Sequence, residues 1–167
     1  LVLLIHGWGS EPAAWATPLQ EAIVANIQAR RDPGVWDVCT LDWSRLAGGL
    51  GSSVSPGDNT PSYAYANGPL VVDAIWPILN SRRYGFAHLV GHSAGSLIVN
   101  LLAISFKNPG ASEPAVVHTT FLDAYDAGFN TELAGDLFNS QYGCHADWAD
   151  SYVDMRGDIF GLIRNTN

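Results

Sequence analysis

The stretch Gly91-His92-Ser93-Ala94-Gly95 decides how this chain of 167 residues is interpreted. It has the form Gly-x-Ser-x-Gly and stands between a β-like run at 86–90 and an apolar run of helical length at 96–104. A serine in a sharp turn from strand to helix presents its hydroxyl at the end of a sheet, where it works as a nucleophile. The flanking glycines fit this geometry, because a side chain there would collide with the neighbouring strand or helix. We therefore predict that Ser93 is a nucleophile, with an ordinary glycine-rich connection as the alternative.

Composition favours an enzyme built on a sheet and argues against two kinds of main partner. The chain is 47% hydrophobic and only 14% charged. A net charge of −8 and a pI near 4.8 argue against nucleic acid or an anionic membrane, because both require a basic surface. No uncharged apolar stretch reaches membrane-spanning length, and no signal peptide is visible. The two cysteines leave the disulfide state open, and Cys39 is expected to be a buried thiol in a strand rather than a partner of Cys144.

Strand-like and helix-like segments alternate along the chain, which predicts an α/β fold with a mostly parallel sheet covered by helices on both faces. Strands are predicted at 1–5, 35–43, 86–90, 116–122 and 151–155, and helices at 10–30, 70–79 and 96–104. The segment 47–61 is a long loop rich in glycine and serine, of a kind that borders binding clefts. No repeat or linker divides the chain, so residues 1–167 are predicted to form a single domain. We expect this domain to be incomplete at both ends.

A serine nucleophile needs donors for the oxyanion that forms on the substrate. The backbone N–H of Ala94, at the start of the predicted helix, is the first donor by position. The second is expected from the backbone N–H of Trp8 in the turn His6-Gly7-Trp8-Gly9, where Gly7 lets the backbone approach a substrate. An ordinary turn after a strand is the alternative for this segment. His6 is expected to be structural, holding the loop by hydrogen bonds.

The nucleophile also needs a base, and an acid that orients the base. Asp123 follows a predicted strand and comes after Ser93 in the order expected of this arrangement, so it is the candidate acid. Asp126 is a rival, and a carboxylate that only shapes the loop is a further alternative. His145 is the one histidine that follows Asp123, and it is a weak candidate base because it stands early in the chain. We expect the base to lie beyond Asn167.

Several segments resemble, in order, those of the α/β-hydrolase family, and most closely the pancreatic-type triacylglycerol lipases. The similar segments include the strand and turn at 3–8, the Asp-Trp element at 41–44, the serine turn at 87–95 and the acid segment at 120–124. The resemblance implies that Ser93 and Asp123 are nucleophile and acid, and that Trp8 and Ala94 supply the oxyanion N–H groups. Two departures are Ala124, which replaces the family's proline after the acid, and the lack of a recognisable histidine-bearing segment.

The resemblance implies an incomplete α/β-hydrolase domain that cleaves carboxylic esters, with a small-molecule or lipid ester as substrate. An acyl-enzyme would form at Ser93, and no metal or organic cofactor is implied. A secreted protein is expected on the resemblance alone. Two alternatives stay open: an inactive scaffold that binds or stores a ligand, and an acyltransferase that uses the same site.

Overall fold

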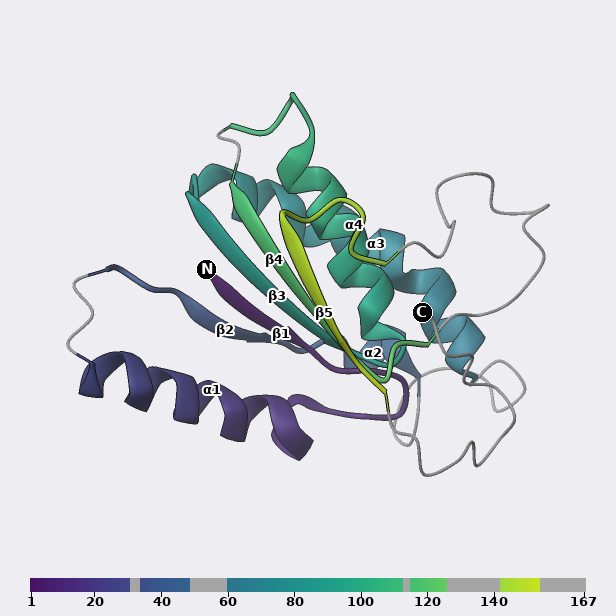
Figure 1. Cartoon of the computed structure of the whole chain (residues 1–167). Helices are drawn as coiled ribbons and strands as arrows, with labels where there is room; N and C mark the ends of the chain where they lie inside the picture. Colours follow the sequence, from purple (N-terminus) through teal and green to yellow (C-terminus); the bar gives the residue numbers. More distant parts are fainter. Residues whose placement is uncertain (31–33, 49–59, 113–114, 126–141, 154–167) are drawn as a thin grey trace.

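The computed structural model describes residues 1–30, 34–48, 60–112, 115–125 and 142–153 (Figure 1). Within these ranges, five strands form one sheet in the order β2-β1-β3-β4-β5, and every neighbouring pair is parallel. The predicted parallel sheet is therefore confirmed. The strands are β1 (Val2–Ile5), β2 (Val38–Leu41), β3 (Phe86–His92), β4 (Val116–Leu122) and β5 (Trp148–Tyr152).

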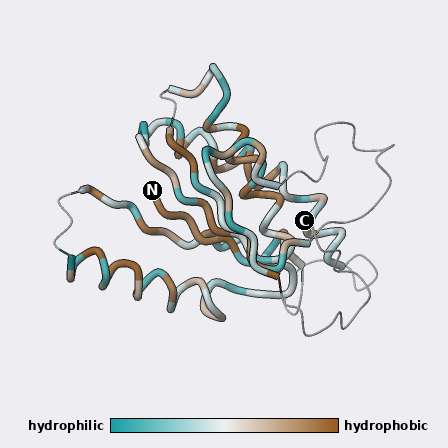
Figure 2. The backbone as a smooth tube through the Cα atoms, viewed as in Figure 1, coloured by the Kyte–Doolittle hydropathy of each residue, from teal (hydrophilic) through white to brown (hydrophobic). Residues whose placement is uncertain are grey.

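Helices cover both faces of this sheet, as predicted. Helix α1 (Pro12–Ala29) lies on one face, whereas α3 (Pro61–Ser81) and α4 (Gly95–Lys107) lie on the other; α2 (Ser44–Ala47) is a short helix after β2 (Figure 1). Side chains alternate along β1, so that Val2 and Leu4 belong to the cluster under α1 while Leu3 and Ile5 belong to the larger cluster under α3 and α4. Both faces of β1 are buried, which explains its continuous apolar run (Figure 2).

Several predicted boundaries were wrong. Helix α3 begins at Pro61 rather than at residue 70, because the Thr60 side chain accepts a hydrogen bond from the Tyr63 N–H and Pro61 suits a first helical turn. Strand β2 is shorter than 35–43, and β5 starts three residues before 151. The predicted loop 47–61 ends in helices at both sides, and its part at 49–59 lies outside the described residues.

Cys39 was predicted to be buried, but its side chain is exposed. The reason is that β2 is an edge strand of the described sheet, and α1 covers the side chain of Val38 rather than that of its neighbour Cys39. Cys144 is also exposed and unpaired, and it precedes β5 at the other edge of the sheet. The two thiols therefore do not form a disulfide in this structure.

The strand order reverses between β1 and β3. From β1 the chain passes through α1 to β2 at the edge, and then returns past β1 to form β3. The connection after β1 leads to the helix on one face, and the connection after β3 leads to α4 on the other face (Figure 1). In open parallel sheets such a switch point is where ligands bind, at the carboxyl ends of the strands. The turns at 6–9 and 91–95 both lie there.

On the face that carries α1, a row of rings extends over β3, β4 and β5. His88 stacks on His118 with ring centroids 4.0 Å apart and planes inclined by 7°, and Trp148 lies 5.2 Å from His118. His88 Nε2 lies 2.9 Å from the Thr120 hydroxyl, and His118 Nε2 lies 2.7 Å from an Asp150 carboxylate oxygen. Burial, and secondly the neighbouring His118, lower the pKa of His88 to about 4.

This lowered pKa makes the folded state sensitive to acid. Between pH 6.5, the ordinary pKa of histidine, and about pH 4, the unfolded chain takes up a proton at His88 that the folded chain does not. Stability is therefore expected to fall as the pH drops through this window. Urea denaturation of His88→Gln at pH 7.5 and 5 should show a smaller acid loss than the wild type. His145→Gln, which changes an exposed histidine, is the control, and an equal loss in wild type and His88→Gln would contradict the argument.

Candidate active site

Ser93 occupies the turn between β3 and α4 with a strained backbone. Its φ is 51°, in the left-handed region that non-glycine residues seldom adopt. Only Arg83, Ser93 and Asp123 show this among the described non-glycine residues. Strand β3 ends at His92 and α4 begins at Gly95, so the chain reverses within two residues. Such strain is concentrated at functional sites, because it holds a side chain in an exposed and fixed position.

The glycines on either side of this turn allow two close contacts. A Cβ atom on Gly95 would lie 2.5 Å from the His6 carbonyl oxygen and 2.8 Å from that of Ile5, at the end of β1. A Cβ atom on Gly91 would lie 2.7 Å from Val99 Cγ2, a side-chain atom of α4. The collisions with strand and helix expected from the sequence are therefore present. They fix the start of α4 against the end of β1.

The turn after β1 packs directly against Ser93. A Cβ atom on Gly7 would lie 2.7 Å from Ser93 Cβ and 2.8 Å from the His92 carbonyl oxygen, so only glycine permits this approach. Trp8 follows in the same turn and is half-buried against the larger core. Ala94 is the N-cap of α4, and its N–H donates no hydrogen bond among the described residues. An orphan donor at a helix N-terminus suits a negative charge.

Asp123 is brought next to Ser93 through backbone hydrogen bonds. The Ser93 N–H donates to the Leu122 carbonyl at 3.0 Å, and the Tyr125 N–H donates to the Ser93 carbonyl at 3.2 Å. Asp123 stands between these two partners and has a left-handed φ of 50°. Its own N–H donates to the Tyr152 carbonyl at 2.7 Å, which extends the β4–β5 ladder to the acid. Ser93 and Asp123 thus both lie at the carboxyl ends of the parallel strands.

Tyr125 is a site residue that the sequence did not reveal. Besides its bond to the Ser93 carbonyl, its hydroxyl lies 3.0 Å from the Ser62 hydroxyl on α3, and its carbonyl accepts from the Tyr142 hydroxyl at 2.9 Å. The Tyr125 ring is buried edge-on to Tyr65, with centroids 6.1 Å apart. These contacts anchor the segment that carries Asp123. The only signal in the sequence is the general richness of this stretch in aromatic residues.

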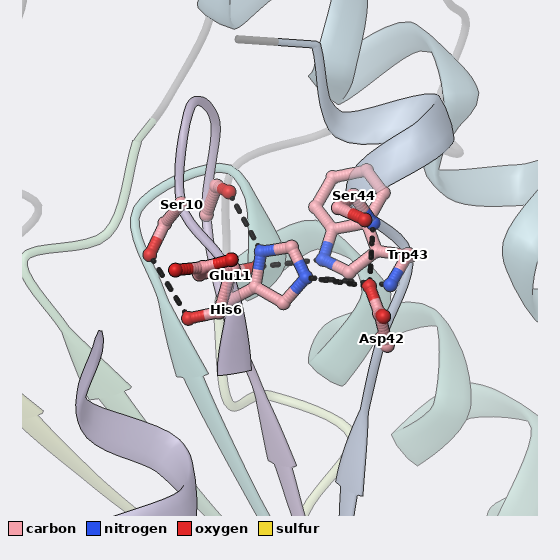
Figure 3. A network of polar contacts seen from close by, with 7 residues as sticks. His6, Ser10, Glu11, Asp42, Trp43 and Ser44 are labelled. Carbon is pink, nitrogen blue, oxygen red and sulfur yellow. Dashed lines mark hydrogen bonds and ion pairs between the residues drawn. The ribbon is translucent and has the colours of Figure 1, made fainter. Parts of the chain in front are cut away.

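His6 holds the turn after β1 by hydrogen bonds, as expected (Figure 3). Its Nδ1 donates to the Gly7 carbonyl at 2.9 Å, and its Nε2 accepts from the Trp43 backbone N–H at 3.3 Å. The Trp43 indole N–H donates to the His6 carbonyl at 2.7 Å. An Asp42 carboxylate oxygen lies 3.9 Å from Nε2. Burial is the largest influence on this fully buried ring and lowers the pKa of His6.

A model of the alpha/beta hydrolase family matches residues 2–163. This chain belongs to that family. The match confirms the predicted fold class, but it does not distinguish the pancreatic-type lipases from other members of the family. The chain is also similar to the crystal structure of a novel pyrethroid hydrolase from Sphingobium faniae JZ-2, at 22% identity and a TM-score of 0.41. That alignment covers 75% of this chain and 40% of the other. No curated protein matches the chain.

In this α/β hydrolase, His145 does not lie near Ser93. The Asp147 N–H, two residues after His145, donates to the Val117 carbonyl near the start of β4, whereas the Ser93 N–H donates to the Leu122 carbonyl at its end. At about 3.3 Å per residue, these two points on β4 are roughly 16 Å apart. His145 precedes β5 and therefore lies at the amino ends of the strands, whereas the nucleophile lies at their carboxyl ends. The structure therefore does not bring His145 to the nucleophile.

The neighbouring His92 does not fill the place of the base either. Its ring packs edge-on against Trp15 of α1, with centroids 6.1 Å apart. Burial lowers the pKa of His92, and the nearby Asp123 opposes this effect. No hydrogen bond within the described ranges involves the Ser93 hydroxyl. The rival acid Asp126 lies outside the described residues.

A cavity of about 590 Å³ lies beside the His6 network, between the end of β2, α2 and α3. Its lining does not include the turns at 6–9 and 91–95, so the cavity is separate from the nucleophile. The cavity is lined by Leu41, Asp42, Trp43, Ser44, Arg45, Leu46, Val71, Ala74 and Ile75.

In the part of the chain that the structure describes, no group of three or more metal-binding side chains comes together. No described helix combines the length and the apolar character needed to cross a membrane.

Replacing Gly95 tests whether the start of α4 must touch the end of β1. Gly95→Ala is expected to lower the free energy of unfolding by about 2–3 kcal/mol, because its Cβ would meet backbone atoms that cannot move aside cheaply. Gly85→Ala is the matched control, because a Cβ there meets nothing within 4 Å. That variant should stay within about 0.5 kcal/mol of the wild type. Chemical denaturation measures both, and equal effects would refute the close contact.

Proposed function

We propose that this hydrolase cleaves carboxylic esters through an acyl-enzyme on Ser93. The observation that carries the proposal is the left-handed backbone of Ser93, held between β3 and α4 and packed against the turn after β1. The Ser93 oxygen attacks the ester carbonyl while a base takes the hydroxyl proton, which then passes to the departing alcohol. Water attacks the acyl-enzyme in a second step, releases the carboxylic acid and restores the serine. The substrate class is a small-molecule or lipid ester.

The oxyanion of the tetrahedral intermediate is assigned to two backbone donors, the N–H groups of Ala94 and Trp8. Ala94 caps α4, so its N–H combines an orphan donor with the positive end of the helix dipole. Trp8 follows Gly7, which is in contact range of Ser93. Donors that are already in place need no reorganisation when the negative charge develops, and this makes them effective in a site shielded from water.

Asp123 is assigned as the acid that orients the base. Its support is its place directly after β4, next to Ser93 at the same edge of the sheet, and its strained backbone. Aspartate tolerates the left-handed region better than most residues, because its short side chain bonds to nearby backbone groups. The base itself is assigned to a histidine outside the described residues, because neither His145 nor His92 meets the Ser93 hydroxyl.

A scaffold without activity is the main alternative, and the backbone at Ser93 argues against it. A left-handed conformation costs a non-glycine residue about 1–2 kcal/mol, a cost that glycine avoids. A protein that only binds a ligand has no use for a strained serine at this turn. Acyl transfer to an alcohol uses the same acyl-enzyme, so product analysis with an added alcohol is needed to separate it from hydrolysis.

Ser93→Ala should abolish ester hydrolysis and leave the fold intact, because it removes only the hydroxyl. The measurement is hydrolysis of a p-nitrophenyl ester by the full-length protein, together with labelling by a fluorophosphonate probe. Ser105→Ala is the control, since the Ser105 hydroxyl bonds within α4 to the Leu101 carbonyl. Turnover or labelling of Ser93→Ala near the wild-type level would show that another residue is the nucleophile.

Asp123→Asn should lower kcat by roughly 10³–10⁴-fold, because a neutral amide neither orients the base correctly nor stabilises its charged form. Asparagine also tolerates a left-handed φ, so the backbone of this variant is expected to stay in place. Asp126→Asn should keep nearly full activity. Steady-state kinetics of both variants decides between the two carboxylates, and a large loss in Asp126→Asn alone would transfer the role to Asp126.

A further inference from the structure

We propose that His6 is a positioning residue of the oxyanion hole, which fixes the direction of the Trp8 N–H by holding the Gly7 carbonyl, as a neutral imidazole with its proton on Nδ1. This inference rests on the proposed function, in which the Trp8 N–H is an oxyanion donor. His6 does not touch the substrate in this assignment and acts through the backbone of its neighbours.

The two partners of the imidazole determine its protonation state. A carbonyl oxygen only accepts, so the 2.9 Å contact between Nδ1 and the Gly7 carbonyl requires a proton on Nδ1. A backbone N–H only donates, so the 3.3 Å contact from the Trp43 N–H requires a lone pair on Nε2. Both conditions are met only by the neutral ring with Nδ1–H. Because His6 is fully buried, no water can replace either partner without cost.

The position of the Gly7 carbonyl sets the direction of the next N–H. The described residues contain no cis peptide bond, so the C=O of Gly7 and the N–H of Trp8 point in opposite directions within one peptide plane. The hydrogen bond from His6 Nδ1 holds the Gly7 carbonyl, so the Trp8 N–H points in the opposite direction. The Gly7 Cα already lies against Ser93, because a Cβ atom there would come within 2.7 Å of Ser93 Cβ.

Gly7 makes this restraint necessary. Glycine leaves the peptide plane free to flip, and a flipped plane would turn the carbonyl oxygen, instead of the N–H, toward the developing negative charge. Attraction would then become repulsion at the step where stabilisation is most needed. The hydrogen bond from His6 opposes the flip. The ring itself cannot rotate freely, because the Trp43 backbone N–H donates to Nε2.

Two variants of His6 separate positioning from packing. Asparagine places its amide nitrogen near the position of Nδ1, so His6→Asn keeps a donor for the Gly7 carbonyl and loses the acceptor for Trp43. Glutamine places its amide oxygen near the position of Nε2, so His6→Gln keeps that acceptor and loses the donor. Both are polar and of similar size to the imidazole, and both lose one of the two bonds.

The experiment compares kcat and KM of these variants with the wild type in the full-length protein, using a p-nitrophenyl ester, alongside thermal denaturation. We expect His6→Gln to lose about 10- to 100-fold in kcat with little change in KM, because an oxyanion donor acts in the transition state. His6→Asn should stay within about 3-fold of the wild type. Equal losses in both variants, or no loss in His6→Gln, would overturn the proposal.

A second measurement covers the case in which neither variant folds. The nitrogen chemical shifts of the wild-type His6 ring distinguish the two neutral tautomers from the charged form. A proton on Nδ1 alone supports the proposal, and a proton on Nε2 overturns it. Failure of the proposed function gives a different pattern, because the wild type itself would then show neither ester hydrolysis nor fluorophosphonate labelling of Ser93.

Discussion

The approach of α4 to the end of β1 is the constraint on which the site depends. Helix α4 begins against the carbonyl oxygens of Ile5 and His6, at a distance that leaves no room for a Cβ atom at position 95. Strand β3 lies beside β1, and only two residues connect its end to α4, so the turn between β3 and α4 has few possible conformations. Ser93 absorbs this geometry in its left-handed backbone. One packing contact therefore places the serine, the helix N-terminus and the turn after β1 within reach of one another.

Buried polar groups then make this arrangement rigid. His6 lies at the end of a strand whose side chains are otherwise apolar, so each of its polar atoms needs a partner within the protein. Trp43 supplies two of these partners from the end of β2, and Gly7 supplies the third. On the other side of Ser93, Tyr125 ties the segment after β4 to α3. The turn of the nucleophile is thus braced from both neighbouring strands, without hydrogen bonds to its own hydroxyl in the described residues.

The sequence predicted best the parts of the chain whose two sides are both buried. Strand β1 is such a part. The range 116–122 was correct at both ends for β4, whose residues 117 and 119–121 are buried. Strand β5 is exposed along its whole length, so no apolar pattern marked its start at Trp148. Helix α3 begins in a stretch rich in turn-forming residues, where the Thr60 cap cannot be distinguished from loop composition. The bonds of Tyr125 and Trp43 depend on segments that are far apart in sequence, and no local pattern reports them.

His145 shows why order along the chain does not give position in a parallel sheet. Order along the chain placed this residue after the acid, but a parallel sheet sorts residues by whether they precede or follow a strand. Residues that follow the strands meet at the carboxyl ends of the sheet, where Ser93 lies, whereas His145 precedes β5. At the carboxyl ends of the strands, the histidines among the described residues are His6 and His92. Both ring nitrogens of His6 form hydrogen bonds, and His92 packs on α1. Within the described residues, therefore, no histidine is placed to act as the base of Ser93.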